Sequence, residues 1–124
     1  MHLLESGEMY LETVYILSAK QTNVRSLDIA AYMGFSRPSV SRAVGLLRKG
    51  GYINVDEKGY ITLTDEGLEI AKKIYERHVL LTDFLVRLGV DSKTAAQDAC
   101  KIEHDISDAS FQAIKSHVVN KQNQ

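Results

Sequence analysis

The chain has little of what marks secreted or membrane proteins. Its 124 residues include one cysteine, one proline and no tryptophan. A single cysteine cannot form an internal disulfide, which excludes a disulfide-stapled secreted domain and agrees with a reducing compartment. No apolar run approaches the roughly 18 residues of a membrane span, and residues 1–5 lack the basic region and apolar core of a signal peptide. We therefore expect a cytoplasmic protein with no membrane partner.

Net charge is also small, at −1, in a chain with 44% hydrophobic and 25% charged residues. That composition is typical of an ordinary globular protein with one domain or two small ones. The charge is unevenly spread, because residues 29–55 hold four basic residues and no acidic one. Such a stretch can steer one face of a protein toward phosphate, although chance clustering would look the same.

Two helical patterns in the first half predict a helix-turn-helix. The first covers residues 26–33, with Ser26 as its N-cap and Gly34 as its stop. The second covers residues 37–48, with Ser36 or Arg37 at its cap position, and Pro38 suits its first turn, where a missing N–H is harmless. The alternative is a generic helical hairpin with a polar outer face.

A β-hairpin pattern follows and argues against that alternative. Residues 52–55 and 60–64 are rich in β-forming side chains and flank a turn that ends at Gly59. Helix-turn-helix followed by hairpin is the order of a winged helix, in which the second helix enters the major groove and the hairpin tip touches a phosphate. The candidate DNA-binding residues are Ser36, Arg37, Pro38, Ser39, Ser41, Arg42 and Lys58.

The other patterns predict helices only, so the expected fold class is mainly α with a small β-hairpin wing. A first helix should cover residues 8–20, with Ser6 as its cap. A long helix over about residues 65–88 should link an N-terminal winged helix to a C-terminal helical domain. Two further helices are expected at residues 92–106 and 108–119.

One stretch near the C-terminus carries three metal-binding groups. On a helix, Cys100 would share a face with Glu103 and His104, because residues three and four apart are neighbours. A thiol, a carboxylate and an imidazole within one turn can hold a metal ion. On spacing alone, a core cysteine beside two solvated polar residues is an equal alternative. Met9 and Glu12 share a face of the first helix in the same way, although core packing and a solvated charge are commoner there.

Five stretches, in order, resemble the diphtheria toxin repressor family of metal-dependent transcriptional regulators. They are residues 8–15, 27–30, 36–41, 63–67 and 100–107. The first and last are the more specific, because the others occur in many winged-helix regulators. The resemblance implies a homodimer of two-domain chains. Residues 1–66 would be a winged-helix domain that binds a double-stranded DNA operator, and residues 67–124 would bind a divalent metal ion and dimerise.

The resemblance also implies a ligand set that mixes two patterns. Iron-responsive members use the positions of Met9, Cys100, Glu103 and His104, and manganese-responsive members use these together with those of Glu12 and His78. The candidate metal ligands are therefore Met9, Glu12, His78, Cys100, Glu103 and His104.

The sequence departs from the iron-responsive pattern in two respects. Thr82 and Ala96 stand where those members carry a carboxylate and an imidazole of a second metal site, so that site is not expected in its usual form. We also expect no SH3-like domain of the kind that many iron-responsive members have, and therefore no ligands from such a domain.

Ligand softness favours iron. The thioether of Met9 and the thiolate of Cys100 prefer Fe²⁺ to Mn²⁺, which prefers oxygen ligands. We therefore expect Fe(II) as the activating metal, Mn(II) as the second choice, and repression of metal-uptake genes when metal is replete. Because Met9 and Glu12 belong to the first domain, a metal shared with the second would fix the two domains and set the spacing of paired recognition helices.

Two other functions compete with metal-dependent repression. A winged-helix regulator that senses a small organic ligand would leave Cys100, Glu103 and His104 without a metal role. A metalloenzyme could use the same ligands, but no clear general base and no glycine-rich loop lies near them in the sequence. We therefore do not expect an enzyme.

Overall fold

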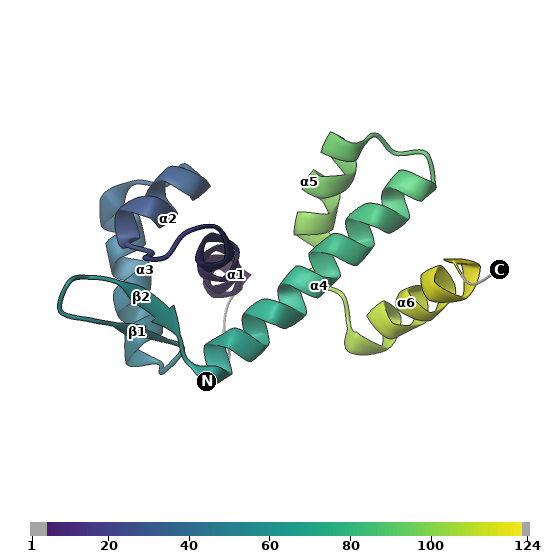
Figure 1. Ribbon diagram of the computed structural model, residues 1–124. Coiled ribbons are helices and arrows are strands. Elements are labelled where there is room, and N and C mark those ends of the chain that lie inside the picture. The colour runs from purple at the N-terminus through teal and green to yellow at the C-terminus, as the bar shows by residue number, and fades with distance from the viewer. Residues whose placement is uncertain (1–4, 123–124) are drawn as a thin grey trace. The chain divides into compact units, whose positions relative to one another are not determined.

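The computed structural model describes residues 5–122, with side chains through residue 119. Mostly helical, it confirms the predicted class of α-helices with one small hairpin (Figure 1). The elements in chain order are α1 (Glu5–Lys20), α2 (Ser26–Met33), α3 (Arg37–Lys49), β1 (Ile53–Val55), β2 (Ile61–Leu63), α4 (Asp65–Arg87), α5 (Ser92–Ile102) and α6 (Asp108–Gln122). Within residues 5–122, no helix is long and apolar enough to cross a membrane.

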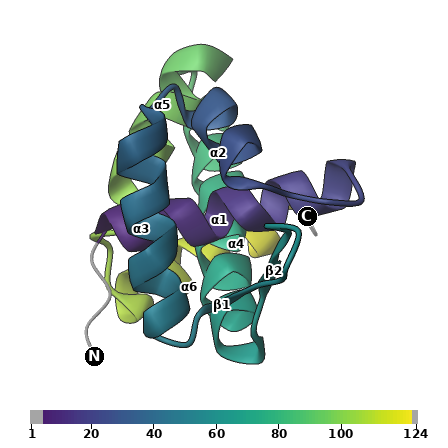
Figure 2. The same ribbon diagram turned by 90° about the vertical axis from the view of Figure 1, so that its left-hand side faces the viewer.

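The chain divides into two compact units, Met1–Lys73 and Ile74–Gln124, and α4 begins in the first and continues in the second. In the first unit, α3 crosses α1, and the hairpin lies beside them (Figure 2). The inward face of α3 is formed by Val40, Val44 and Leu47, as their i, i+4, i+7 spacing predicts. The two strands are antiparallel, with Ile53 opposite Leu63. This unit is a winged helix.

The start of α4 is fastened to the stem of the hairpin. Thr64 donates from its backbone N–H to Tyr52 O at 3.1 Å and from its hydroxyl to Gly51 O at 2.7 Å. The same hydroxyl oxygen caps α4 by accepting from the Gly67 N–H at 3.2 Å. A Cβ at Gly67 would lie only 2.0 Å from Tyr52 O, so glycine is required by the close approach of the two backbones.

The helix ends of this unit agree with sequence expectation in part. Ser36 is the N-cap of α3, and Gly34 ends α2 with a φ of 73°. Ser26 is not the N-cap of α2, because Arg25 holds that position and the Asp28 carboxylate accepts from its N–H at 2.9 Å. Ser6 likewise is no cap, since α1 already includes Glu5.

The second unit packs the C-terminal part of α4 with α5 and α6. Its most buried apolar side chains are Ile74, Leu81, Ala95, Ala99, Phe111 and Val118. Asp91 caps α5 by accepting from the Thr94 N–H at 3.0 Å, and the Ser107 hydroxyl accepts from Ser110 N–H at 3.1 Å at the start of α6. The predicted extension of α5 to residue 106 is wrong, because the helix ends at Ile102 and a turn follows.

Candidate metal centre and nucleic-acid interface

The outer face of α3 carries the candidate DNA-binding side chains. Its sequence has no acidic residue, and its last turn adds Arg48 and Lys49. All residues selected from the sequence are exposed: Ser36, Arg37, Pro38, Ser39, Ser41, Arg42 and Lys58. Cations and hydroxyls on an exposed helix without acidic neighbours can bind phosphate oxygens and base edges.

These exposed residues are not equivalent. Arg37 and Ser41 line a hollow of about 190 Å³ between α2 and α3, together with Ser26 and Leu27. The Ser36 hydroxyl accepts from Ser39 N–H at 3.3 Å and donates to the Ser39 hydroxyl at 2.9 Å. Ser36 therefore caps α3, whereas Ser41 is exposed and lines the hollow.

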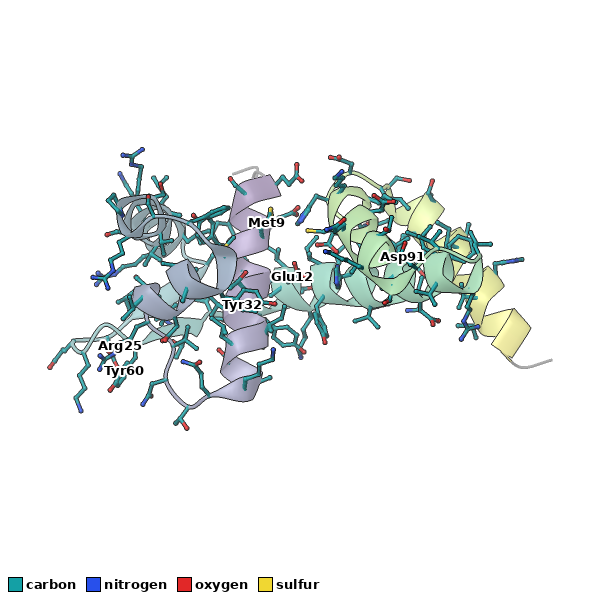
Figure 3. All side chains as sticks on the ribbon, turned by 90° about the horizontal axis from the view of Figure 1, so that it is seen from above. Met9, Glu12, Arg25, Tyr32, Tyr60 and Asp91 are labelled. Carbon is teal, nitrogen blue, oxygen red and sulfur yellow. The ribbon has the colours of Figure 1, made fainter. Side chains whose placement is uncertain are left out.

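Two sets of contacts hold the turn of the hairpin. The Asp56 carboxylate accepts from the N–H groups of Lys58 at 2.9 Å and Tyr60 at 2.8 Å, and Gly59 supplies a φ of 83°. Tyr60 ends this turn just before β2, and the Arg25 guanidinium lies 4.7 Å from the centre of its ring and donates to its hydroxyl at 3.0 Å (Figure 3). The hairpin thus presents Lys58 from a fixed turn.

Three of the candidate metal ligands come together in the second unit. Nδ1 of His78 lies 2.9 Å from Oε2 of Glu103, and Nε2 of His104 lies 3.3 Å from Oε1 of the same carboxylate. The side chains of Glu103 and His104 are 0% exposed, and that of His78 is 30% exposed. Cys100 lies in the last turn of α5, Glu103 is the C-cap of that helix in a helical conformation, and His104 lies in the turn that follows.

The carboxylate of Glu103 is held in its ionised form by its neighbours. Burial by itself raises the pKa of Glu103, but the contacts with His104 and His78 outweigh it and place the pKa below its ordinary value of 4.5. An ionised carboxylate between two imidazoles keeps negative charge in a site with little solvent. A bound cation would therefore be attracted by the negative charge of the Glu103 carboxylate.

The other candidate ligands lie on helices. Met9 is half-buried and Glu12 is buried, one turn apart on α1 (Figure 3). Cys100 is half-buried in the last turn of α5 and forms no disulfide. Met9, Glu12 and Cys100 therefore remain ligands predicted from the sequence. The distances given above concern His78, Glu103 and His104.

The residues of the cluster fit a divalent transition metal. Imidazole nitrogens and a carboxylate are ligands that Fe²⁺ and Mn²⁺ both accept. Oε1 of Glu103 is a buried atom with no hydrogen bond among the described residues, although Nε2 of His104 lies near it. A buried carboxylate oxygen left in this state is suited to a metal–oxygen bond.

No sequence motif selected Arg77, which the structure places beside this cluster. Arg77 is 5% exposed and donates from Nη1 to Glu103 O at 3.1 Å and to Ile106 O at 2.8 Å. Its Nη2 forms an ion pair with Asp108. An arginine on a helix is usually solvated. The role of Arg77 could therefore be recognised only once the position of the turn after α5 was known.

Comparison with known protein families covers nearly the whole chain. Residues 2–61 match the N-terminal DNA-binding domain of iron-dependent repressors. Residues 64–122 match the metal-binding and dimerisation domain of the same proteins. The chain belongs to the iron-dependent repressor family. The resemblance to metal-dependent regulators of the diphtheria toxin repressor type is thereby confirmed.

Individual relatives of this family member are transcriptional regulators. An uncharacterised regulator of the helix-turn-helix type from Methanocaldococcus jannaschii, MJ0568, is 37% identical over 114 residues, which is 90% of each chain. The regulator MntR of Lysinibacillus sphaericus is 35% identical over 102 residues, covering 82% of this chain and 73% of its own. The family and these relatives are regulators and not enzymes, as expected.

Solved structures of similar proteins support the same fold. The manganese regulator SloR matches with a TM-score of 0.82 and 27% identity, over 90% of this chain and 53% of its own. A manganese-dependent transcriptional repressor in complex with manganese matches with a TM-score of 0.80 and 29% identity, over 90% and 51%. The chain thus spans about half the length of these solved proteins. At the level of the family, it is a metal-dependent transcriptional regulator.

Proposed function

We propose that this family member is a repressor of metal-uptake genes that binds a DNA operator as a homodimer in the cytoplasm when it carries Fe(II). The observation that carries the proposal is the cluster of His78, Glu103 and His104. It unites two imidazoles and an ionised carboxylate inside the segment that matches the metal-binding domain. A purely structural ion pair would not need two histidines on one buried carboxylate.

The proposed ligand set adds Met9, Glu12 and Cys100 to this cluster. Metal bound there would supply a fixed positive charge and directed bonds to the donor atoms. Met9 and Glu12 belong to α1, which is part of the winged helix. The metal affinity of the site would therefore depend on whether the two domains are in the arrangement that binds DNA. A coupling of about 1.4 kcal/mol between metal and DNA binding is enough for a tenfold gain in DNA affinity.

Iron is proposed because of the sulfur ligands. Met9 and Cys100 are soft donors, and soft donors favour Fe²⁺ over Mn²⁺. Manganese is the second candidate, because two of the similar solved proteins are manganese regulators. Glu12 and His78 are compatible with either metal. Cys100 is therefore the residue whose replacement should change the preference.

A gel-shift titration under anaerobic conditions tests the proposal and its choice of metal. Wild type should bind operator DNA at lower concentrations of Fe²⁺ than of Mn²⁺, and His104→Ala should need much more of either. Cys100→Glu should shift the preference toward Mn²⁺, because it replaces a thiolate by a carboxylate. DNA binding that is indifferent to all metals and to His104→Ala would contradict the proposal.

The proposed DNA contact that is easiest to test is Arg42. Arg42→Ala should weaken specific DNA binding by about 1–3 kcal/mol if the side chain reads a base, and more evenly across sequences if it binds phosphate. Lys72→Ala, which removes an exposed cation from α4, is the matched control and should change neither. Fluorescence anisotropy with operator and scrambled duplexes at two salt concentrations separates these results. Equal affinity of Arg42→Ala and wild type for both duplexes would exclude a recognition role.

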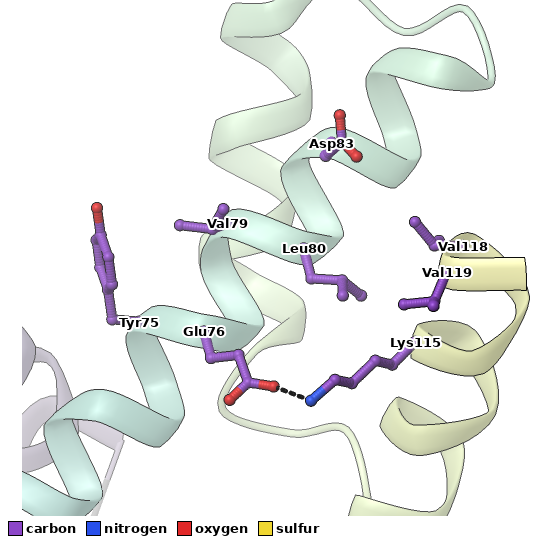
Figure 4. Close-up of a pocket in the computed structure, with 8 residues that line it drawn as sticks. All are labelled: Tyr75, Glu76, Val79, Leu80, Asp83, Lys115, Val118 and Val119. Carbon is purple, nitrogen blue, oxygen red and sulfur yellow. Dashed lines mark hydrogen bonds and ion pairs between the residues drawn. The ribbon is translucent and has the colours of Figure 1, made fainter. Parts of the chain in front are cut away.

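We also propose where the second copy packs. A groove of about 520 Å³ lies between α4 and α6 in the segment that matches the dimerisation domain (Figure 4). Its apolar lining is partly exposed, with Val79 at 49% and Val119 at 41%. The groove carries both signs of charge, since Glu76 and Lys115 pair across it at 2.6 Å. A surface with apolar centre and both charges can complement its own copy about a twofold axis.

Sedimentation equilibrium tests this surface. Val79→Glu should raise the dissociation constant of the dimer, because it places a charge in the apolar centre of the groove. Gln112→Glu adds the same charge to an exposed position of α6 that does not line the groove and should leave the dimer intact. A Val79→Glu protein that dimerises like wild type would place the interface elsewhere.

A further inference from the structure

Arg77 is a buried cation that is neither a metal ligand nor a DNA contact. Its side chain is 6% exposed, and its guanidinium lies 5.4 Å from the centre of the Phe111 ring. Removing a guanidinium from water is costly unless several hydrogen bonds compensate for it. Three such contacts exist, with Glu103 O, Ile106 O and the carboxylate of Asp108. Arg77 therefore binds the segment between α5 and α6.

That segment contains the ligand turn, residues 103–107. Its first residue, Glu103, still donates its backbone N–H to Ala99 O at 2.9 Å, as in a helix, but α5 ends at Ile102 and contacts from other elements are needed to fix the backbone that follows. Nη1 of Arg77 binds the carbonyl oxygens of Glu103 and Ile106, which stand on either side of His104 in the chain. The planar guanidinium is well suited to hold two such acceptors at a fixed separation.

Arg77 and the next residue of α4, His78, both contact Glu103. His78, the next residue, contacts the Glu103 carboxylate at 2.9 Å, while Arg77 holds the Glu103 carbonyl at 3.1 Å. Two consecutive residues of one helix thus hold the same glutamate by its side chain and by its main chain. Glu103 has little freedom left before any metal arrives.

We propose that Arg77 is a positioning residue for the metal centre. By binding the main chain of the ligand turn it preorganises Glu103 and His104, so metal binding need not order them. This inference rests on the proposed function. The two carbonyl contacts should matter most, because the Asp108 side chain is 66% exposed and its ion pair is screened by water.

Metal titration of Arg77→Met tests the positioning role. Methionine fills much of the same space without donors, and metal affinity should fall about 10- to 100-fold, as is typical when a group that orients ligands is lost. Arg77→Lys keeps the charge but not the fork, and should recover part of the affinity. Asp108→Asn should stay within about threefold of wild type, because it leaves both carbonyl contacts in place. Competition with a chromogenic chelator gives the affinities.

A second readout follows the turn without metal. The N–H groups of Asp105 and Ile106 both donate to Ile102 O at 3.0 Å. In metal-free Arg77→Met these amides should exchange with deuterium faster than in wild type. Leu81→Ala is the control for general loss of stability, because it empties a buried position of α4. Leu81→Ala should have a metal affinity close to that of wild type. Its rate of amide exchange in the turn, relative to the rest of the unit, should also be close to that of wild type.

The outcomes separate the two proposals. If wild type binds metal, and Arg77→Met binds it equally well or loses no more than Leu81→Ala, the positioning role is wrong and the proposed function stands. If exchange in the turn is unchanged in Arg77→Met, the positioning role is wrong whatever the metal affinities. If wild type binds no metal, the proposed function fails and the metal role of Arg77 fails with it.

Discussion

Replacement of Glu103 by glutamine separates what this carboxylate does for the fold from what it does for a metal. The amide keeps the size and an acceptor oxygen, so the contact with His78 Nδ1, now 2.9 Å, can persist as a neutral hydrogen bond. A hydrogen bond to a charged group contributes roughly 1.5–3 kcal/mol, and a neutral one roughly 0.5–1.5 kcal/mol. Glu103→Gln should therefore lower the free energy of unfolding of the metal-free protein by about 1–2 kcal/mol at pH 7.

The pH dependence of this difference follows from the lowered pKa of Glu103. Because the folded pKa lies below the ordinary value of 4.5, the ionised carboxylate stabilises the folded protein at every pH above that value. The stabilisation is lost as the pH falls through the folded pKa, where a protonated acid and an amide are nearly equivalent. The stability difference between wild type and Glu103→Gln should thus be full near neutrality and shrink below pH 4.5.

Urea unfolding in the presence of chelator, at steps of pH, measures this difference. Glu69→Gln, which neutralises an exposed carboxylate on α4, is the matched control and should leave stability near that of wild type. Metal affinity in the same preparations should fall far more for Glu103→Gln than its loss of stability suggests, since a proposed ligand is removed. Our reasoning would be refuted by a variant as stable as wild type at pH 7, or by a difference that stays constant down to pH 3.

Two further predictions concern the fold. Gly67→Ala should destabilise the winged helix by roughly 3 kcal/mol through overpacking, because the new methyl group would meet Tyr52 O at 2.0 Å. Gly45→Ala is the control, since it adds a methyl group in open space on α3 and should be neutral or stabilising. Thermal unfolding of the two variants measures the difference. Asp91→Ala should lower the melting temperature by removing the acceptor for the Thr94 N–H. That N–H holds the pKa of Asp91 below 3.8, so the effect should be present above pH 3.8 and fade as the pH falls through the folded pKa, and a Tm unaffected by the change at neutral pH would contradict it.

The fold was predictable because its signals are local. The spacing of Val40, Val44 and Leu47 defines the buried face of α3, and Ser36 caps it one residue before the helix begins. Gly59 closes the hairpin turn with a positive φ that other residues rarely adopt. Each of these features depends on a few neighbouring residues, which a sequence displays directly.

The end of α5 was not predictable in that way. Ala95, Ala99, Ile102 and Ile106 continue a helical spacing, and the sequence therefore predicted a helix to residue 106. The helix ends at Ile102 where contacts from a distant element begin, since Arg77 lies 26 residues before Glu103 in the chain and binds its carbonyl. The meeting of His78 with Glu103 was anticipated only through family resemblance, and the spacing of residues on one helix could not show it.

Because Arg77 recognises the ligand turn through main-chain oxygens, the turn should be tolerant of changes in identity and intolerant of changes in length. Carbonyl oxygens are common to all residues, so exposed Asp105 could be replaced by many side chains without disturbing the contacts. Insertion or deletion of one residue between Glu103 and Asp108 would instead move the carbonyls out of reach of a single guanidinium. Among related chains, the distance along the backbone from ligand to α6 should therefore vary less than the residues that fill it.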